Sequence, residues 1–569
     1  MITQTLETYI ADALKAIGIE SHPIVLEHPG ELSHGDFATN VALALSKKVG
    51  MKPRELAEKI VAKLLEKKPS EISKIEIAGP GFINFHLSKD FLVGAVASVL
   101  ATHSATASAP RRSHSSAHAQ KVMVEYTQPN PFKEFHIGHL MNNAIGEAIS
   151  RVLEGSGKEV KRATYHGDVG MHVAKTIWAL KRSGSGAEGL TLESMGKAYA
   201  EGNTAFETDP ASKTEIVSLN KKIYERTDAK INALYDAGRK ASLDGFEKIY
   251  KRLGSTFDFH FFESESAPAG KEIVLQQLER GIFEKSDGAV VFHGEKYGLH
   301  TRVFLNKEGI ATYEAKEIGL IALKEKAYPH TLSLTITANE QSEFFKVVRS
   351  AAEQIYPELV GAIKHLSHGM MRLPSGKMSS RTGTIISAEN LIDEAHTLAR
   401  KKLADRDMSD SEKEKVAEQV AIGAIKYAIL RQAIGGDIIF DFEKSLSFEG
   451  DSGPYLQYTT VRARTVLAKA KAVGLTPDTT VIPQTVGDLE RTLYRFPEVL
   501  AKSATEYAPH LLVTFAIELS SAFNAYYGNN LIIDEKNPES PYRLALTSAT
   551  TMTLEKILHV LAIPVPERM

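Results

Sequence analysis

The chain has 569 residues, of which 43% are hydrophobic and 24% are charged, and its formal net charge is −2. A chain of this length is too long for one hydrophobic core, so we expect roughly three to four domains. The absence of cysteine excludes disulfides, thiolate zinc sites and cysteine nucleophiles. A net charge this close to zero does not by itself indicate a nucleic-acid partner, although it can hide local basic faces.

The hydropathy pattern predicts a cytoplasmic protein without a membrane-spanning segment. No apolar run approaches ~18 residues without charges. The amino-terminal stretch MITQTLETYIADALK is amphipathic and acidic, unlike a secretory signal peptide.

Residues 1–100 have the pattern of a compact α/β domain. Apolar positions recur at helical spacing in an opening amphipathic helix, and again in ELSHGDFATNVALALSKKVG and PRELAEKIVAKLLEKK. The segment IEIAGPGFINFHLS then predicts two short strands around a Gly-Pro-Gly turn. Lysines on the helices are balanced by glutamates, which is equally compatible with a solvated face and with a face that contacts nucleic acid.

Residues 101–120 differ from what precedes them. The segment ATHSATASAPRRSHSSAHAQ is rich in Ala, Ser and His and has no periodicity. Such a composition cannot bury a core, so it predicts a flexible linker and a domain boundary. Arg111 and Arg112 are explained more simply as ordinary charged residues of a flexible linker than as residues that contact RNA.

The stretch from residue 122 to residue 148 predicts a strand, a loop and the start of a helix. A β-branched run at 122–126 indicates a buried strand, TQPNPFKEF interrupts it, and helix-forming residues begin at His136 and Gly138. The free N–H groups and the positive dipole end at such a junction suit a phosphate. His136 and His139 lie about one turn apart, where both can donate to a triphosphate. A metal site is disfavoured because there is no cysteine and no third ligand nearby in sequence.

The segment that follows predicts a Rossmann-like parallel sheet. EVKRATYHGDVGMHVAKTIWALK indicates a second strand that ends at Tyr165 and a helix that starts near Val169, so a βαβ crossover is the economical arrangement. The intervening His166-Gly167-Asp168 lies at the sheet edge where such folds bind ligands. Residues 181–262 are helical and alternate in charge, which indicates an insertion.

Sequence beyond residue 289 is expected to complete this sheet. AVVFHGEKYGLHTRVFLNKEGIATYEAKEIGLIALK predicts a hairpin followed by a helix, and SLTITANEQSEFFKVVRSAAEQI predicts a strand followed by a helix. Tyr313, Glu317, Glu340 and Gln341 lie near these strand ends or helix starts. Each alone is better explained as a capping or surface residue, but their joint placement favours a functional role.

A glycine-flanked loop, SGKMSSRTG, follows at 375–383. Its basic and hydroxyl side chains have a composition typical of phosphate binding. Beyond residue 387, six amphipathic segments with short polar joints predict a helical bundle. Tyrosines and arginines interleave along these segments. Aromatics at helical spacing are usually core, but at helix ends they also stack unpaired bases, and arginines there hold phosphates.

These motifs resemble those of a known family. His-Ile-Gly-His at 136–139 followed by Lys-Met-Ser-Ser-Arg at 377–381 resembles the paired signatures of class I aminoacyl-tRNA synthetases. HGDFATN and GPGFINF are similar to the N-terminal additional domain of arginyl-tRNA synthetases, which contacts the tRNA D-loop. VEYTQPNPFKEFHIGHL, EGDSGPYLQYTTVRAR, RFPEVL and PVPERM are similar to the first signature and the anticodon-binding domain of the same family, so the resemblance covers nearly the whole chain.

The resemblance implies four parts: an N-terminal domain at 1–100, the linker at 101–120, a Rossmann-type catalytic domain at 121–387 with the helical insertion, and a helical anticodon-binding domain at 388–569. It implies ligation of L-arginine to its cognate tRNA in two steps. Arginyl-adenylate forms from ATP with release of pyrophosphate, and the arginyl group then moves to the 3′-terminal adenosine. Mg²⁺ would enter bound to ATP, and no resident metal is expected. The resemblance also implies a monomer, activation of arginine only after tRNA has bound, and no editing, because the insertion is too short.

Candidate site residues follow from the resemblance and from substrate chemistry. A planar cation with five donors needs an acceptor wall, which the carboxylates of Glu125 and Glu317 and the hydroxyl of Tyr313 can supply. The resemblance implies these catalytic residues: His136, His139, Lys133, Lys377 and Arg381. It implies that ATP contacts Gly138, His136, His139, Glu340, Met378 and Ser379. It implies that arginine also contacts Asn130, His136 and Gln341, with Asn130 and Gln341 at its α-amino end. For tRNA it implies Tyr455, Gln457, Tyr458, Arg462, Asp36, Asn40, Phe82 and Asn84.

Two positions depart from the family pattern. Family members usually carry Asp where this chain has Glu317, and the extra methylene moves the carboxylate by about an ångström. The second Lys of the usual Lys-Met-Ser-Lys-Ser signature is Ser380 here. Lys133, just before the first signature, matches a lysine that many family members with this loss carry.

Two other classes of protein fit the sequence less well. A synthetase-like RNA-binding protein that has lost its chemistry has no physical need for the combined phosphate-binding residues. A small-molecule adenylyltransferase with a His-x-Gly-His helix start needs no helical bundle after residue 387. Among synthetases, the acidic pocket residues disfavour glutamyl and glutaminyl specificity, and the lack of cysteine disfavours cysteinyl specificity.

Overall fold

The computed structural model describes residues 2–20, 22–107, 119–374 and 387–569. The chain forms two compact units. The first unit comprises Met1–Arg112, Tyr458–Lys502 and Thr514–Ile557, and the second comprises Ser113–Gln457, Ser503–Val513 and Leu558–Met569. In the described ranges, no helix is long and apolar enough to cross a bilayer.

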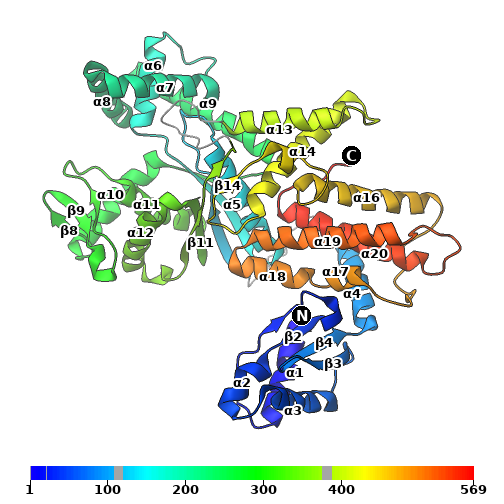
Figure 1. The fold of residues 1–569 in the computed structure, drawn as a ribbon. Coiled ribbons are helices and arrows are strands. Elements are labelled where there is room, and N and C mark those ends of the chain that lie inside the picture. The colour runs from blue at the N-terminus through cyan, green and yellow to red at the C-terminus, as the bar shows by residue number, and fades with distance from the viewer. Residues whose placement is uncertain (1, 21, 108–118, 375–386) are drawn as a thin grey trace. The chain divides into compact units, whose positions relative to one another are not determined.

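The amino-terminal part of the first unit contains a four-stranded antiparallel sheet with the order β1-β2-β4-β3 (Figure 1). Its strands are β1 (Leu26–Glu27), β2 (Phe37–Thr39), β3 (Ile72–Ala78) and β4 (Phe82–Leu87). The hairpin β3–β4 confirms the predicted pair of strands around the Gly-Pro-Gly turn. Gly81 has a φ of +140°, and a Cβ there would lie 2.9 Å from the carbonyl oxygen of Pro53, so this turn requires glycine.

Four helices accompany this sheet: α1 (Ile2–Ala16), α2 (Val41–Val49), α3 (Pro53–Glu66) and α4 (Lys89–Ala107). Their apolar faces and the sheet share one core, which includes Leu6, Ile10, Phe37 and Phe85. Helix α4 continues to Ala107, so the prediction that residues 101–120 lack regular structure is wrong for their first part. Alanine-rich sequence extends a helix readily once packed turns have started it. Residues 108–118, with Arg111 and Arg112, lie outside the described residues.

The second unit is built on a five-stranded parallel sheet with the order β12-β11-β5-β6-β7. The strands are β5 (Lys121–Glu125), β6 (Glu159–His166), β7 (Phe259–Phe262), β11 (Leu332–Ala338) and β12 (Ile363–His368). Helices α5 (Ile137–Gly155), α6 (Met171–Arg182), α10 (Glu263–Glu279), α11 (Tyr313–Ala327) and α12 (Ser342–Ile355) connect or follow them. The predicted Rossmann-like sheet is confirmed. Neighbours β6 and β11 flank β5, so the carboxyl end of β5 is the switch point where such sheets bind ligands.

The helical insertion consists of α7 (Leu192–Thr208), α8 (Pro210–Glu225) and α9 (Ala229–Leu253), which lie beside α6 at the upper left of Figure 1. The sheet resumes with β7 at Phe259, so the predicted insertion boundary at residue 262 is too late. The aromatic run Phe259–Phe262 pairs with β6 because its side chains suit a pleated, half-buried surface.

The prediction that the hairpin from residue 289 belongs to the parallel sheet is wrong. Strands β8 (Glu284–Ser286), β9 (Ala289–Phe292) and β10 (Arg302–Leu305) form a separate antiparallel sheet. A tight turn at Asp287-Gly288, both with positive φ, closes β8 onto β9. Local pairing through such a turn satisfies these strands without the main sheet.

The carboxyl-terminal region is almost wholly helical, as predicted. Its helices are α13 (Ala388–Lys402), α14 (Asp410–Leu430), α15 (Phe442–Ser445), α16 (Gly453–Ala472), α17 (Asp488–Leu493), α18 (Phe496–Glu506), α19 (Pro509–Asn529) and α20 (Ser540–Val560), and β13 (Met371–Arg372) pairs with β14 (Ile438–Ile439). One of the six amphipathic segments, at residues 488–504, forms two helices, α17 and α18, and not one. Pro497 explains the break, because proline is accommodated in the first turn of a helix and not in its interior.

Candidate active site

The loop between β5 and α5 has an unusual backbone. Thr127, Gln128 and Phe132 have φ values of +74°, +52° and +65°, a region that non-glycine residues rarely adopt. Strain of this kind persists only where surrounding contacts enforce it. The N–H groups of these three residues donate to Asn142 Oδ1, Thr164 Oγ1 and Ser242 Oγ. These hydrogen bonds therefore fix the backbone conformation of the loop at the carboxyl end of β5.

His136 and His139 stack at the start of α5, with ring centroids 3.6 Å apart. Nδ1 of His136 accepts the backbone N–H of Gly138 at 3.1 Å, and Nδ1 of His139 accepts the backbone N–H of His136 at 3.3 Å. An imidazole nitrogen that accepts a hydrogen bond carries no proton, so each neutral ring carries its proton on Nε2. A Cβ at position 138 would lie 2.9 Å from Nδ1 of His136, which explains the glycine.

Both rings are held in the neutral form. Burial lowers the pKa of His136 to about 4, and the charge of Lys133 acts in the same direction. Burial also holds the pKa of His139 well below its usual value, with further contributions from His136 and Lys133. Neutral imidazoles with Nε2–H are hydrogen-bond donors at physiological pH. The pair thus offers two neutral donors at the positive end of a helix dipole, which suits a phosphate.

The buried histidines predict that acid destabilises the second unit. The pKa values of His166 and His172 are also lowered, to about 3 each, chiefly by burial. Because the unfolded chain takes up protons first, stability should fall as pH drops from about 6.5 towards 4, by on the order of 10 kcal/mol in sum before opposing groups are counted. Glu317, with a pKa raised to about 8, opposes this, as do Glu134, Glu263, Glu389 and Asp451, whose pKa values burial also raises. Imidazoles outnumber them, because burial also lowers the pKa values of His260, His330, His365, His368 and His510. Trp178, the only tryptophan, lies in α6 and reports unfolding of this unit.

The measurement is the urea midpoint of tryptophan fluorescence at pH 7.5 and at pH 5.0. A midpoint at pH 5.0 that equals or exceeds the one at pH 7.5 would contradict the prediction. A His172→Gln variant, which keeps a side-chain donor for the carbonyl of Gly167 that His172 Nε2 contacts at 2.8 Å, should show a smaller difference between the two pH values.

A cleft of about 550 Å³ opens beside this junction. Three of the predicted site residues line it: Asn130, Lys133 and Tyr313. Burial lowers the pKa of Lys133, whose Nζ lies 4.5 Å from the ring centroid of Tyr199. Tyr313 is 72% exposed at the start of α11. The structure thus brings a cation, an amide and a phenol to one opening.

The orientation of Asn130 is fixed by the loop after β6. Its Oδ1 accepts the backbone N–H of Gly167 at 3.2 Å, and a Cβ at position 167 would lie 2.5 Å from this oxygen. The Nδ2 group of Asn130 is therefore the part left to contact a ligand, and it is a donor. A donor there suits the carboxylate of an amino acid better than the α-amino group that the sequence resemblance implied.

Asp168 connects this loop to two other elements. The carboxylate is fully buried and accepts from Arg239 Nε at 3.0 Å and from Tyr235 Oη at 3.1 Å, both on α9. It also accepts the backbone N–H and the hydroxyl of Ser264 at the start of α10. The motif around Asp168 was predicted to lie at the ligand-binding edge of the sheet, but no role was predicted for its carboxylate. The signal for it in the sequence was a carboxylate between Gly167 and Gly170, directly after a predicted strand.

The acidic residues predicted to bind arginine are buried together. Glu125 is 1% exposed and forms an ion pair with Lys324 of α11, a residue that sequence analysis missed. Gln128 Nε2 also donates to Glu125. Burial, together with the neighbouring charge of Glu125, raises the pKa of Glu317 to about 8. Glu317 and Lys324 line a second cavity of about 240 Å³ beneath α11 and α12.

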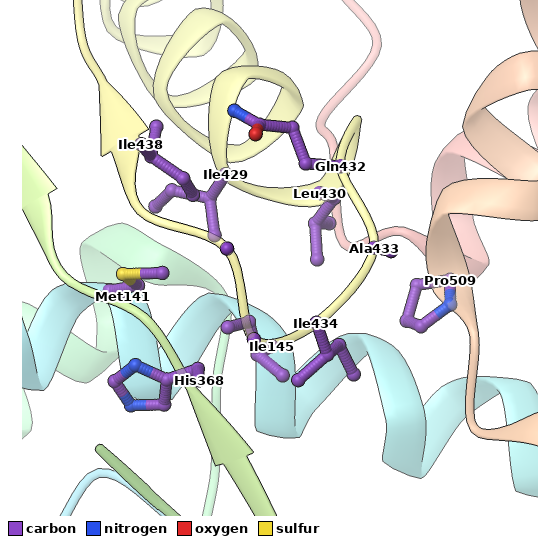
Figure 2. A pocket seen from close by; sticks show the side chains of 12 residues that line it. Met141, Ile145, His368, Ile429, Leu430, Gln432, Ala433, Ile434, Ile438 and Pro509 are labelled. Atoms are coloured by element: carbon purple, nitrogen blue, oxygen red, sulfur yellow. The ribbon is translucent and has the colours of Figure 1, made fainter. Parts of the chain in front are cut away.

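Other predicted residues lie elsewhere. Glu340 and Gln341 are exposed in a short turn directly after β11, and neither lines the two cavities above. Lys377, Met378, Ser379 and Arg381 lie outside the described residues. A further cavity beside α5, lined by Met141, Ile145 and His368, has a volume of only about 10 Å³ (Figure 2). It can hold about one water molecule, so it is not a substrate site.

The residues predicted to contact tRNA differ in accessibility. Asn40 is exposed, Phe82 is 39% exposed, and Tyr455, Tyr458 and Arg462 are partly exposed. Three others are buried and already bonded or packed. Asp36 pairs with Arg491 and accepts the N–H of Leu87, Asn84 lies inside the sheet, and Gln457 donates to the carbonyls of Gln419 and Pro564. A direct contact with RNA would require these side chains to leave their partners, so they are better explained as structural.

Fold and site together define a class I aminoacyl-tRNA synthetase: a parallel sheet with paired imidazoles at the helix start after its central strand, followed by a helical carboxyl-terminal region. Family models agree. The model for the class I tRNA synthetase (R) catalytic domain matches residues 102–442, that for the arginyl tRNA synthetase N-terminal domain matches 4–87, and that for the DALR anticodon binding domain matches 456–569. The chain belongs to the arginyl-tRNA synthetase family.

Relatives match along the whole chain. The arginine–tRNA ligase of Treponema denticola is 30% identical and that of Limosilactobacillus reuteri is 29% identical, with 99% or more of each chain covered. The solved arginyl-tRNA synthetase of Thermus thermophilus has 26% identity and a TM-score of 0.81 and covers 100% of both chains. The predictions of family, fold and enzyme class are confirmed. Members of the family use ATP to ligate arginine to tRNA in two steps.

Proposed function

We propose that the β5–α5 junction and the adjoining cleft form the site where this chain activates L-arginine and transfers it to its cognate tRNA. The observation that carries the proposal is the stacked pair His136 and His139, which present two neutral Nε2–H donors at a helix start. Donors of this kind stabilise charge at a phosphate without a proton transfer.

The chemistry needs two displacements. The arginine carboxylate oxygen attacks the α-phosphorus of ATP, and a new phosphorus–oxygen bond forms. The bond between the α-phosphorus and the oxygen that bridges to the β-phosphorus breaks, and pyrophosphate leaves with that oxygen. His136 and His139 donate to the α-phosphate oxygens, and Lys133 adds positive charge. A ribose hydroxyl of the terminal adenosine of tRNA then attacks the activated carbonyl, and AMP leaves. In this proposal Asn130 Nδ2 donates to the arginine carboxylate, and Glu317 pairs with the guanidinium.

Several features remain expectations from the family resemblance. Mg²⁺ enters bound to the phosphates of ATP, which are its preferred kind of ligand. The described residues contain no cluster of three or more metal-ligating side chains. The active form is a monomer in the cytoplasm. The domains divide at about residues 100, 120 and 387, with the linker starting after α4, and the family models for 4–87, 102–442 and 456–569 support this division.

Arginine-dependent exchange of pyrophosphate into ATP tests the proposal. The reaction is run with and without tRNA specific for arginine, and with lysine, glutamate and glutamine as controls. Exchange with arginine alone among the amino acids supports the assignment, and a requirement for tRNA would establish the coupling that the resemblance implies. A His136→Ala variant should lose exchange. Exchange with none of the amino acids would instead favour an RNA-binding protein without catalysis.

We expect Phe82, in the first unit, to contact tRNA. Its ring is 39% exposed on β4, and an exposed aromatic ring is a stacking surface for a base. Phe82→Ala should raise the KM for tRNA by about 5- to 100-fold, as expected for one lost stacking contact, without changing the KM for ATP. Leu65→Ala is the matched control, because Leu65 is a similarly exposed apolar residue on α3. Equal effects of the two variants on the KM for tRNA would contradict the assignment.

A further inference from the structure

We propose that Lys324 sets the charge of the pocket for the arginine side chain and thereby determines selection of a guanidinium over a neutral analogue. In this assignment Lys324 neutralises Glu125, which leaves Glu317 as the carboxylate that pairs with the substrate. The inference rests on the proposed function, because it assumes that Glu125 and Glu317 face the arginine side chain.

The position of Lys324 is fixed by deep burial. Its side chain is 2% exposed, it forms an ion pair with Glu125, which is 1% exposed, and its Nζ lies 3.4 Å from Thr335 Oγ1 on β11. Lys324 follows Glu317 by two turns of α11, so both side chains lie on the same face of that helix. The two residues line the same cavity of about 240 Å³. A buried lysine is costly unless it is paired, so this cation has a specific electrostatic role.

The charges near this cavity can be assigned pair by pair. A third acidic residue, Glu263, lines the neighbouring cleft of about 550 Å³ and forms its own ion pair there with Lys316. Glu125 is paired with Lys324. Within the ranges that the structure describes, Glu317 has neither an ion-pair partner nor a hydrogen-bond donor. Of these three acidic residues, Glu317 is therefore the one without a basic partner among the described residues, and its carboxyl group is the one available to a guanidinium.

The surroundings of Glu317 explain why Lys324 matters. Burial and the neighbouring Glu125 raise the pKa of Glu317 to about 8, whereas Lys324 acts to lower it. Because this pKa lies above 7, the two adjacent carboxylates of the empty pocket share a proton at pH 7, and an arriving guanidinium has to displace it. Without Lys324 the pKa of Glu317 would be higher still, and the proton would be harder to displace. A protonated carboxyl group binds a guanidinium poorly but can donate to the carbonyl of citrulline. The other charged or titratable groups around Glu317 are Tyr165, Glu263, Lys346, Arg349, Lys364 and His365.

The test is the KM for arginine in tRNA-supported pyrophosphate exchange between pH 6.5 and pH 9, with citrulline as the competing substrate. Lys324→Met should raise the KM for arginine about tenfold or more at pH 7, the change expected for a pKa shift of one unit, and the KM should recover towards pH 9. The preference for arginine over citrulline should fall at pH 7. Lys324→Arg, which keeps the charge, should stay near the wild-type values. Activity of the wild-type enzyme reports on the proposed function separately.

A double variant keeps the test decisive if loss of the lysine impairs folding. Glu125→Gln combined with Lys324→Met removes both members of the ion pair and restores the net charge of the cluster. It should fold and should bind arginine more tightly at pH 7 than Lys324→Met does. A loss in Lys324→Met that is the same at every pH, unchanged citrulline discrimination, or a double variant no better than the single one would overturn the proposal and leave Lys324 a structural role.

Discussion

Replacing Lys133 with alanine is expected to lower the turnover of arginine activation by about 100-fold or more while changing the KM for arginine little. Lys133 lies three residues before His136, lines the cleft of about 550 Å³, and carries its charge in a partly buried position. A cation held out of water acts strongly on charge that develops at a nearby phosphate. An interaction made mainly in the transition state lowers turnover without weakening substrate binding.

The measurement is steady-state pyrophosphate exchange with purified variants. Lys197→Ala is a suitable control, because Lys197 is an exposed lysine on α7 that pairs with Glu193. Tyr199→Phe keeps the ring beneath the Lys133 ammonium group and should retain turnover. Turnover near the wild-type value in Lys133→Ala would remove this lysine from the mechanism, and a rise in the KM for arginine alone would assign it to substrate binding.

Glu317→Gln is expected to lower kcat/KM for arginine by about 10- to 150-fold, with the KM for ATP unchanged. The estimate follows from the loss of one charge-assisted hydrogen bond, worth ~1.5–3 kcal/mol. The glutamine side chain keeps the shape of Glu317 but loses the negative charge. The measurement compares arginine and ATP dependence in the same exchange assay, and an equal effect on both substrates would indicate disrupted folding.

The Glu317→Asp variant separates the effect of the carboxylate's charge from the effect of the side chain's length. Aspartate is the residue that the family usually carries here, and it keeps the carboxylate but withdraws it by about an ångström. We expect a smaller loss than in Glu317→Gln, because the charge remains while the hydrogen bond lengthens. A loss in Glu317→Asp as large as in Glu317→Gln would mean that placement matters as much as charge in this pocket.

Sequence was sufficient for features that depend on neighbours in the chain. Helical and strand periodicity, the proline-containing loop and the His-Ile-Gly-His motif predicted the β5–α5 junction, because a strand, a turn and a helix cap are encoded within about twenty residues. The resemblance of separate motifs then gave the family. The separate antiparallel sheet of β8, β9 and β10 was missed, since periodicity predicts a hairpin but not the sheet that it joins.

Partners that are distant in sequence were decided by the tertiary structure. Lys324 lies far from Glu125 in the chain, Asp168 meets Arg239 of the helical insertion, and Asp36 meets Arg491 at a separation of 455 residues. Each charged residue alone fits a solvated surface, and sequence contains no local signal for its burial. Sequence by itself determined the family and the imidazole pair at the start of α5, whereas packing decided which carboxylates are neutralised, because burial makes a charge costly unless a partner comes with it.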